Sequence, residues 1–120
     1  MIQIKRVYST PEKSDGVRLL IDRLWPRGIK KSELSLDEWI KELAPSAEVR
    51  KKFGHDREHW KEFKAEYLKE LRTPEAKEKL EEIAKLARKM NLTLLYSARD
   101  EEYNNARVLK EVLERKLKKY

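Results

Sequence analysis

Apolar residues along this chain form short runs typical of strands and longer stripes typical of helices. The alternating residues 2–8 predict a first strand. Residues 17–25 are apolar on both faces and predict a second strand that is covered on both sides, ended by a Pro-Arg-Gly turn at residues 26–28. Residues 92–96 (LTLLY) show the clearest strand pattern in the chain. Together these runs favour a mostly parallel sheet.

The remaining apolar stripes predict helices. Ser46 is a suitable N-cap for a helix over residues 47–53, and Gly54 is a suitable end. Spacings of three and four predict an amphipathic helix over residues 60–71, and a Thr-Pro pair starts another helix at residue 73. Asp100 is the expected cap of a last helix, with two glutamates following it in the first turn.

Residues 34–43 fit two interpretations. Leu36, Trp39, Ile40 and Leu43 lie at helical spacing, but a strand that ends at the Pro-Ser pair of residues 45–46 is equally consistent with the pattern. We interpret the segment as a strand. Because the chain shows no repeat, linker or low-complexity stretch, we expect residues 1–120 to form one α/β domain, with helices packed around the sheet.

Composition narrows the classes of function. The 120 residues include 29 Lys and Arg against 22 Asp and Glu, and the formal charge of +7 favours anionic partners such as phosphate-bearing small molecules or nucleic acid. Many of the lysines alternate with glutamates on predicted helices, so much of this charge is also expected on solvated faces. The absence of cysteine excludes disulfides and thiolate chemistry.

Composition also bears on location and stability. No stretch approaches the roughly 18 apolar residues of a membrane span, and the first residues lack the apolar core of a signal peptide, so we expect a cytoplasmic protein without membrane contact. A surface rich in Lys and Glu, with a single Gln, follows the trend of proteins from hot environments.

The densest candidate site is the motif DRLWPRGIKK at residues 22–31, which follows the second predicted strand. In parallel sheets ligands bind at the carboxyl ends of strands, which here selects residues 8–9, 23–28 and 97–104. Arg23 and Arg27 offer planar donors suited to phosphate or carboxylate, and Trp25 can stack on a flat group. The alternative is that Trp25 belongs to the core, Asp22 pairs with an arginine and the lysines are solvated.

Other candidates are weaker. Ser97 follows the strand at residues 92–96, and we favour an ordinary loop hydroxyl over a nucleophile because no base stands near it in sequence. His55 and His59 are four residues apart, but no third ligand has a recognisable spacing and a loop separates them, so no metal site is predicted. No phosphate-loop, dinucleotide or zinc motif occurs, and no cofactor is expected.

Several motifs in combination resemble a known family. They are KRVY (residues 5–8), SDG (14–16), DRLWPRGIKK (22–31), LDEW (36–39), APS (44–46) and LTLLYSA (92–98). Over nearly its whole length the chain resembles the YeaO branch of the domain-of-unknown-function 488 (DUF488) family. The resemblance implies a small Rossmann-like α/β domain of three layers, with a mostly parallel sheet and flanking helices, and supports a strand within residues 34–43. It implies no settled activity.

The resemblance also bears on catalysis. The wider family carries a Cys-His-Arg motif at the start of its last helix, and the matching positions here are Asn104, Asn105 and Ala106. Asparagine orients a ligand but does not exchange protons near neutral pH. Asp22 is then the one motif carboxylate available as a base, and pairing with an arginine would keep it ionised. Whether the protein is an enzyme stays open, and binding is the better-supported expectation.

We therefore predict a protein that binds a nucleotide-like or other phosphorylated ligand at the strand ends. The predicted binding residues are Arg6, Tyr8, Arg23, Trp25, Arg27, Ser97 and Asn104. One alternative is non-catalytic binding of nucleic acid through a basic face. Another is a protein-interaction module, either monomeric or a homodimer joined through Trp39 or Trp60.

Overall fold

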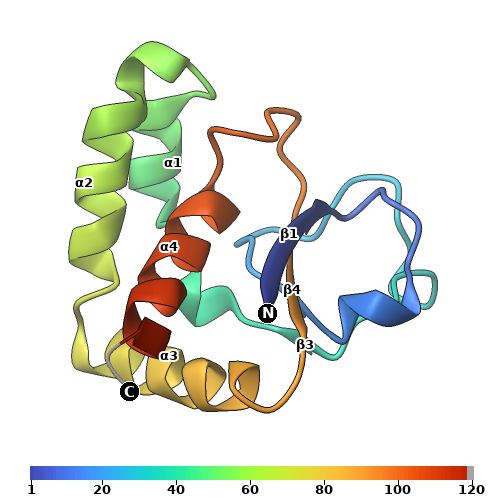
Figure 1. The fold of residues 1–120 in the computed structure, drawn as a ribbon. Helices are drawn as coiled ribbons and strands as arrows, with labels where there is room; N and C mark the ends of the chain where they lie inside the picture. Colours follow the sequence, from blue (N-terminus) through green and yellow to red (C-terminus); the bar gives the residue numbers. More distant parts are fainter. Residues whose placement is uncertain (119–120) are drawn as a thin grey trace.

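The computed structural model describes residues 1–118, which contain four strands, four α-helices and three short 3-10 helices (Figure 1). The strands are β1 (Ile2–Arg6), β2 (Val17–Leu20), β3 (Glu38–Trp39) and β4 (Leu92–Tyr96). The α-helices are α1 (Ala47–Phe53), α2 (Trp60–Glu70), α3 (Pro74–Ala87) and α4 (Asn105–Lys118). The 3-10 helices are η1 (Lys13–Asp15), η2 (Lys41–Leu43) and η3 (Arg57–His59).

All strand pairs are parallel, and the strand order is β1-β4-β2-β3. Strand β4 therefore lies between two strands from the beginning of the chain, with Leu92 aligned to Ile2 on one side and to Val17 on the other. All five of its residues are buried, because neighbours cover it at both edges and on both faces. The predicted mostly parallel α/β sheet is confirmed.

The two faces of the sheet are covered differently, which gives three layers (Figure 1). Alternate residues of β4 point to opposite faces: Leu94 packs in the cluster that contains the four α-helices, and Leu95 packs in a second cluster with Leu20 and Val7. The second cluster is closed by residues of the 22–37 segment, including Trp25 and Leu34. We call η1 together with residues 22–37 the loop layer, since no α-helix covers this face.

The first three helices follow the predicted local signals. The Ser46 hydroxyl accepts a hydrogen bond from the Val49 N–H at 3.2 Å, and Gly54 ends α1 in the left-handed conformation (φ 55°). Thr73 caps α3 in the same way, with Pro74 at the first helical position.

Several element boundaries differ from the predictions. Strand β1 ends at Arg6, whereas the pattern predicts a strand over residues 2–8. Strand β2 ends at Leu20 instead of residue 25, because the chain turns away after Ile21, whose N–H still donates to the Leu95 carbonyl at 3.2 Å. The strand predicted within residues 34–43 is limited to Glu38–Trp39, and a 3-10 turn follows it.

The last helix also begins later than the sequence predicts, at Asn105 instead of directly after Asp100. Asp100 accepts hydrogen bonds from the Glu102 and Tyr103 amides at 3.0 Å, so it caps a turn that precedes the helix. The N-cap of α4 is Asn104, whose Oδ1 accepts from the Arg107 N–H at 3.0 Å. Asp and Asn are comparably good caps, and local preference alone does not choose between them.

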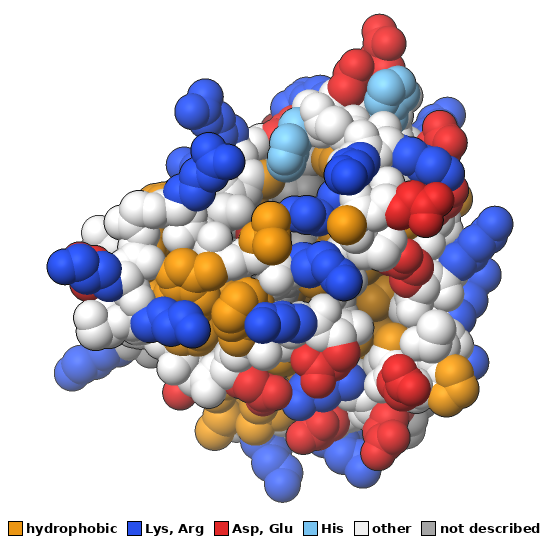
Figure 2. All heavy atoms as spheres, turned by 180° about the vertical axis from the view of Figure 1, so that it is seen from behind, with side chains coloured by type: hydrophobic (Ala, Val, Ile, Leu, Met, Phe, Trp, Pro, Cys, Tyr) orange, Lys and Arg blue, Asp and Glu red, His pale blue; other side chains and the backbone are white. Residues whose placement is uncertain are grey.

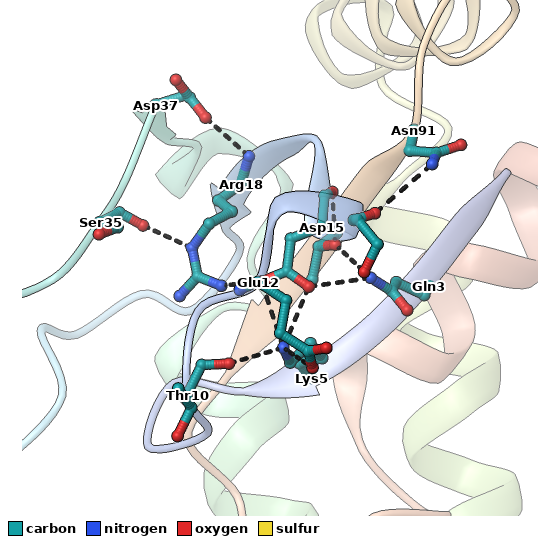
Figure 3. Close-up of polar contacts among 11 residues, drawn as sticks. Gln3, Lys5, Thr10, Glu12, Asp15, Arg18, Ser35, Asp37 and Asn91 are labelled. Atoms are coloured by element: carbon teal, nitrogen blue, oxygen red, sulfur yellow. Dashed lines mark hydrogen bonds and ion pairs between the residues drawn. The ribbon is translucent and has the colours of Figure 1, made fainter.

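A buried charge cluster attaches the loop layer to the sheet (Figure 3). Asp15 is 1% exposed, and its carboxylate accepts from Lys5 Nζ at 3.0 Å and from the Arg18 guanidinium. Burial by itself raises the pKa of Asp15, but the Glu12 amide, Lys5 and Arg18 outweigh it and lower that pKa below its ordinary value. Arg18 Nε also donates to the Ser35 carbonyl at 2.7 Å, which fixes the end of the loop layer.

Candidate functional site

The chain leaves β2 and β4 in opposite directions at their carboxyl ends. After β2 it passes into the loop layer, and after β4 residues 97–104 lead to α4 on the helical face (Figure 1). Two adjacent parallel strands whose continuations separate in this way leave a crevice between them, the usual ligand position in open α/β sheets. The candidate site lies in this crevice.

Asp22 holds the two sides of the crevice together. Its Oδ2 accepts hydrogen bonds from the Ser97 backbone N–H at 2.9 Å and from the Ser97 hydroxyl at 2.6 Å. Its Oδ1 accepts from Asn105 Nδ2 at 3.0 Å, and the same amide group donates to the Ile21 carbonyl at 3.1 Å. Both carboxylate oxygens are therefore engaged, and the end of β2 is fixed to the loop after β4 and to the first turn of α4.

A cavity of about 250 Å³ lies on the helical side of Asp22, and we call it the inner cavity. Phe53, Phe63 and Pro45 supply its apolar walls. Its polar and charged lining consists of Asp22, Arg23, Arg50, Lys51, His55, Ser97, Asn104 and Asn105. Arg50 and Lys51 reach it from α1, because that helix packs over the same end of the sheet.

A second cavity of about 250 Å³, the outer cavity, lies beside the loop layer. Its lining consists of Tyr8, Asp22, Leu24, Trp25, Pro26, Arg27, Arg50 and Ser97. The two cavities have three residues in common, Asp22, Arg50 and Ser97. They therefore adjoin along one wall and can be occupied by different parts of one ligand.

The cleft formed by the two cavities carries more positive than negative charge. Arg23, Arg27 and Arg50 form no ion pair with any carboxylate among residues 1–118, whereas Arg57, Lys64 and Lys116 elsewhere on the surface are paired. The Nε of Arg50 is buried and has no hydrogen-bond acceptor in the described structure. On the face shown in Figure 2, Lys and Arg side chains lie beside exposed hydrophobic ones.

Contacts within the chain hold the aromatic residues of the outer cavity in place. The Tyr8 hydroxyl donates to the Arg27 carbonyl at 2.9 Å, and the Arg6 guanidinium lies 4.9 Å from the centre of the Tyr8 ring. The Trp25 indole N–H donates to the Ile29 carbonyl at 2.6 Å. The Trp25 ring also packs edge to face against Trp39, with centroids 5.3 Å apart.

Six of the seven predicted binding residues line one cavity or both. These are Tyr8, Arg23, Trp25, Arg27, Ser97 and Asn104. Arg6 does not line either cavity: its guanidinium donates to the Ser97 and Ala98 carbonyls, so it supports the loop after β4. Asn104 is 1% exposed and both ends of its amide serve the cap of α4. Trp25 is interpreted from the sequence either as a core residue or as a binding residue, and it fits both interpretations, since it packs in the second cluster and also lines the outer cavity.

Sequence reasoning did not identify Arg50 and Lys51, and it singled out Asn105 only as a position that matches the wider family's Cys-His-Arg motif, not as a binding residue. The first two belong to a run of basic residues at the end of α1, which is indistinguishable in sequence from a solvated helix face. Asn105 has no local pattern that predicts its contact with Asp22. Only the position of α1 and α4 over the strand ends brings these side chains into the cleft.

The histidines do not share a helical face. His55 follows Gly54 in the left-handed conformation (φ 58°) and lines the inner cavity, whereas His59 belongs to η3. Among residues 1–118 no three His, Cys, Asp or Glu side chains gather as they would around a metal ion.

Proton-transfer groups in the cleft are few. Asp22 and His55 line the inner cavity, and they form no hydrogen bond with each other in the described structure. Burial and then the nearby Asp22 charge raise the pKa of Tyr67 well above its ordinary value, so this phenol stays neutral. Its hydroxyl donates to the Leu43 carbonyl.

Comparison with known proteins places these features in a family. Residues 1–120 match a family profile described as the inactive DUF488-N3 subclade. The chain is 52% identical over 108 residues to YeaO of Escherichia coli K12, an uncharacterized protein, covering 90% of this chain and 92% of that one. It is 35% identical over 112 residues to the uncharacterized proteins Mb3100c of Mycobacterium bovis and Rv3073c of Mycobacterium tuberculosis, covering 93% of this chain and 92% of each.

Two further findings complete the comparison. No solved structure matches the chain. None of the helices in residues 1–118 combines the length and the apolar composition needed to cross a bilayer.

Proposed function

Because this chain belongs to the YeaO-like branch of the DUF488 family, within its inactive DUF488-N3 subclade, we propose that it binds a small anionic ligand rather than transforming one. The ligand class is a phosphate-bearing molecule, and its site is the cleft between the ends of β2 and β4. The observation that carries the proposal is a cleft lined by three arginines without an ion pair among residues 1–118 and by a single carboxylate whose two oxygens already accept three hydrogen bonds.

Arg50 is the central residue of the proposed site. It lines both cavities, and its buried Nε lacks an acceptor. A buried donor without a partner is unfavourable by about 1–3 kcal/mol, so an oxygen atom of a bound ligand would relieve that penalty. Arg23 and Lys51 in the inner cavity and Arg27 in the outer cavity add charge on either side. Planar guanidinium groups pair with the oxygens of phosphate and of carboxylate alike, but the gathering of four cations around one site favours the higher negative charge of a phosphate.

Three features support binding without catalysis. Asn104 and Asn105 stand at positions where the resemblance to the wider family implies a cysteine and a histidine, and here they serve as the α4 cap and as a clamp on Asp22. The Asp22 oxygens are already engaged as acceptors, which leaves this carboxylate poorly placed to take a proton from a ligand. His55 is exposed, and among residues 1–118 it has no carboxylate partner to orient its ring.

The test is calorimetric titration of the protein with inorganic phosphate and pyrophosphate, beside thermal unfolding in their presence. A ligand that binds the folded state alone stabilises it, by about 2.7 kcal/mol at a hundredfold excess over Kd. The variant Arg50→Gln should lose this stabilisation. Arg72→Gln is the matched control, because Arg72 is exposed in the turn after α2 and loses the same charge away from the cleft.

Loss of binding in Arg50→Gln with retention in Arg72→Gln supports the site. Equal loss in both variants would mean that phosphate responds only to net charge. No binding of either anion to the unsubstituted protein rejects the proposal.

The nucleic-acid alternative stays a prediction with its own support. Arg27, Lys30 and Lys31 are exposed without ion pairs among residues 1–118, and Lys31 Nζ lies 5.9 Å from the Trp25 ring centre. Base stacking beside basic side chains is the usual single-strand binding surface. A single-stranded oligonucleotide in the same titration distinguishes the two, because its affinity would fall steeply with added salt.

The interaction-module alternative has less support. Trp39 donates its indole N–H to the Asp22 carbonyl at 2.7 Å, and Trp60 packs against Phe53, Phe63 and Tyr103. Neither tryptophan is among the exposed large hydrophobic residues of the described chain. Whether the protein is a monomer or a homodimer stays a prediction.

A further inference from the structure

Four large hydrophobic side chains are exposed within residues 1–118, and two of them line the same cavity. Tyr8 is 47% exposed and Leu24 is 60% exposed, and both border the outer cavity next to Trp25 and Pro26. The other two, Met1 and Met90, border neither cavity. Apolar surface gathered beside a polar cleft is typical of a ligand site.

The exposed aromatic ring is also held rigidly. Tyr8 is fixed at its hydroxyl by the Arg27 carbonyl and at its ring by the Arg6 guanidinium. Trp25 is fixed by its bond to the Ile29 carbonyl and by Trp39. Fixing a side chain costs conformational entropy. An exposed ring buries little apolar surface, so burial offsets little of that cost. A bound ligand that covers the ring would add the missing apolar burial, and because the ring is already fixed, binding would cost little further entropy.

The charges are distributed unequally between the two cavities. The inner cavity contains Arg23, Arg50 and Lys51 against Asp22, and its aromatic walls, Phe53 and Phe63, are themselves almost fully buried in the core. The outer cavity contains Arg27 and the shared Arg50 against the shared Asp22, beside its exposed apolar residues, so it has one cation fewer than the inner cavity. An anionic group is therefore best held on the inner side of Arg50, and a flat apolar group on the outer side.

We propose that the cleft takes a phosphate ester of a flat aromatic or heteroaromatic alcohol, with the phosphate in the inner cavity and the ring in the outer cavity. The inference rests on the proposed function, which places a phosphate in the cleft, and it adds an aromatic ring as the second part of the ligand. Arg50, common to both cavities, contacts the phosphate beside the ester oxygen, and Tyr8, Leu24 and Trp25 receive the ring. Asp22 and Ser97, which are hydrogen-bonded to each other and line both cavities, orient the ester where the two cavities adjoin.

The experiment compares three probes by titration calorimetry: inorganic phosphate, glycerol phosphate and phenyl phosphate. Glycerol phosphate shares the ester but lacks the ring. Phenyl phosphate should bind about tenfold more tightly than either, the factor expected for one aromatic contact of this kind. Leu24→Ala should remove much of that gain and leave the affinity for inorganic phosphate unchanged. Tyr8→Ala should lower the affinity for phenyl phosphate more than the affinity for inorganic phosphate, because it removes the ring contact and also the bond that holds the Arg27 carbonyl. Met90→Ala is the matched control, because Met90 is 47% exposed like Tyr8 and lies away from both cavities.

The outcomes separate this inference from the proposed function. Equal affinities for phosphate and phenyl phosphate overturn the inference and leave phosphate binding in place. A phenyl phosphate gain that survives in both Tyr8→Ala and Leu24→Ala also overturns it, since the ring then lies elsewhere. Absence of phosphate binding in the unsubstituted protein overturns the proposed function itself. Circular dichroism of each variant confirms that the fold is retained before its affinities are compared.

Discussion

Replacing Asp22 by Asn should weaken the fold and strengthen anion binding at the same time. Asp22 accepts three hydrogen bonds, two from Ser97 and one from Asn105. An asparagine whose Oδ1 takes the place of Oδ2 keeps both bonds from Ser97, but its amide then faces the amide of Asn105. Asn105 is unable to turn its amide over without losing its bond to the Ile21 carbonyl. The variant therefore loses the bond from Asn105 to a charged group, and its two bonds from Ser97 become bonds to a neutral group.

These losses set the expected magnitude. A hydrogen bond to a charged group contributes about 1.5–3 kcal/mol and a neutral one about 1 kcal/mol, so we expect Asp22→Asn to lower the free energy of unfolding by about 3 kcal/mol. Removing the one negative charge of the cleft should at the same time raise phosphate affinity about fivefold, since two unit charges about 4 Å apart in water interact by about 1 kcal/mol.

Urea unfolding and phosphate titration of the same preparation measure both effects. Asp37→Asn is the control, because Asp37 is exposed, accepts one bond from the Arg18 N–H at 2.8 Å and lines neither cavity. It should change stability by less than about 1.5 kcal/mol and leave phosphate affinity unaltered. Unchanged phosphate affinity in Asp22→Asn would refute the placement of the anion beside Asp22, and unchanged stability would refute the clamp.

Two further predictions concern the framework around the cleft. Gly16→Ala should strongly lower the midpoint of thermal unfolding, because a Cβ there would lie 2.1 Å from the Asn91 carbonyl oxygen. Gly28→Ala should lower it only mildly, because Gly28 also has a positive φ but a Cβ there would meet nothing within 4 Å. Equal losses in the two variants would rule out the clash. Asp100 is held by Arg57 and by the Tyr103 and Glu102 amides, which lower its pKa from 3.8 to about 2. Its contribution to stability is therefore present above about pH 3.8 and lost as the pH falls towards 2, so the stability difference between the unsubstituted protein and Asp100→Asn should vanish over that interval; a constant difference would contradict this.

The helices were predictable because their signals are local. Ser46 with Gly54 and Thr73 with Pro74 mark helix ends within a few residues of the backbone groups they satisfy. The boundary errors arose where a distant partner decides the outcome. Strand β2 ends where Asp22 binds the loop after β4, and that loop lies 75 residues further along the chain. No local pattern reports such a contact.

The candidate site was predictable only in part, for a similar reason. Parallel strands bring their carboxyl ends to one edge of the sheet, but which ends lie together depends on the strand order. Arg23 and Ser97 line the same cavity because β2 and β4 are neighbours in the sheet. Arg50 joins them because α1 packs over that edge, and its sequence surroundings, three consecutive basic residues, are those of an ordinary charged helix end. Arg6 illustrates the converse: it lies at the carboxyl end of β1, but its guanidinium donates to the backbone carbonyls of residues 97 and 98 and lines neither cavity.

The strand order also bears on how the chain folds during synthesis. Strands β1 and β2 emerge first from the ribosome but do not pair with each other, because β4 occupies the place between them. Until that late segment arrives, both early strands present unpaired edges, and such edges are prone to pair with other chains. The Lys5–Asp15–Arg18 cluster links these two strands through residues close in sequence. It can keep them at the spacing of a missing neighbour, so that β4 inserts into a gap already formed.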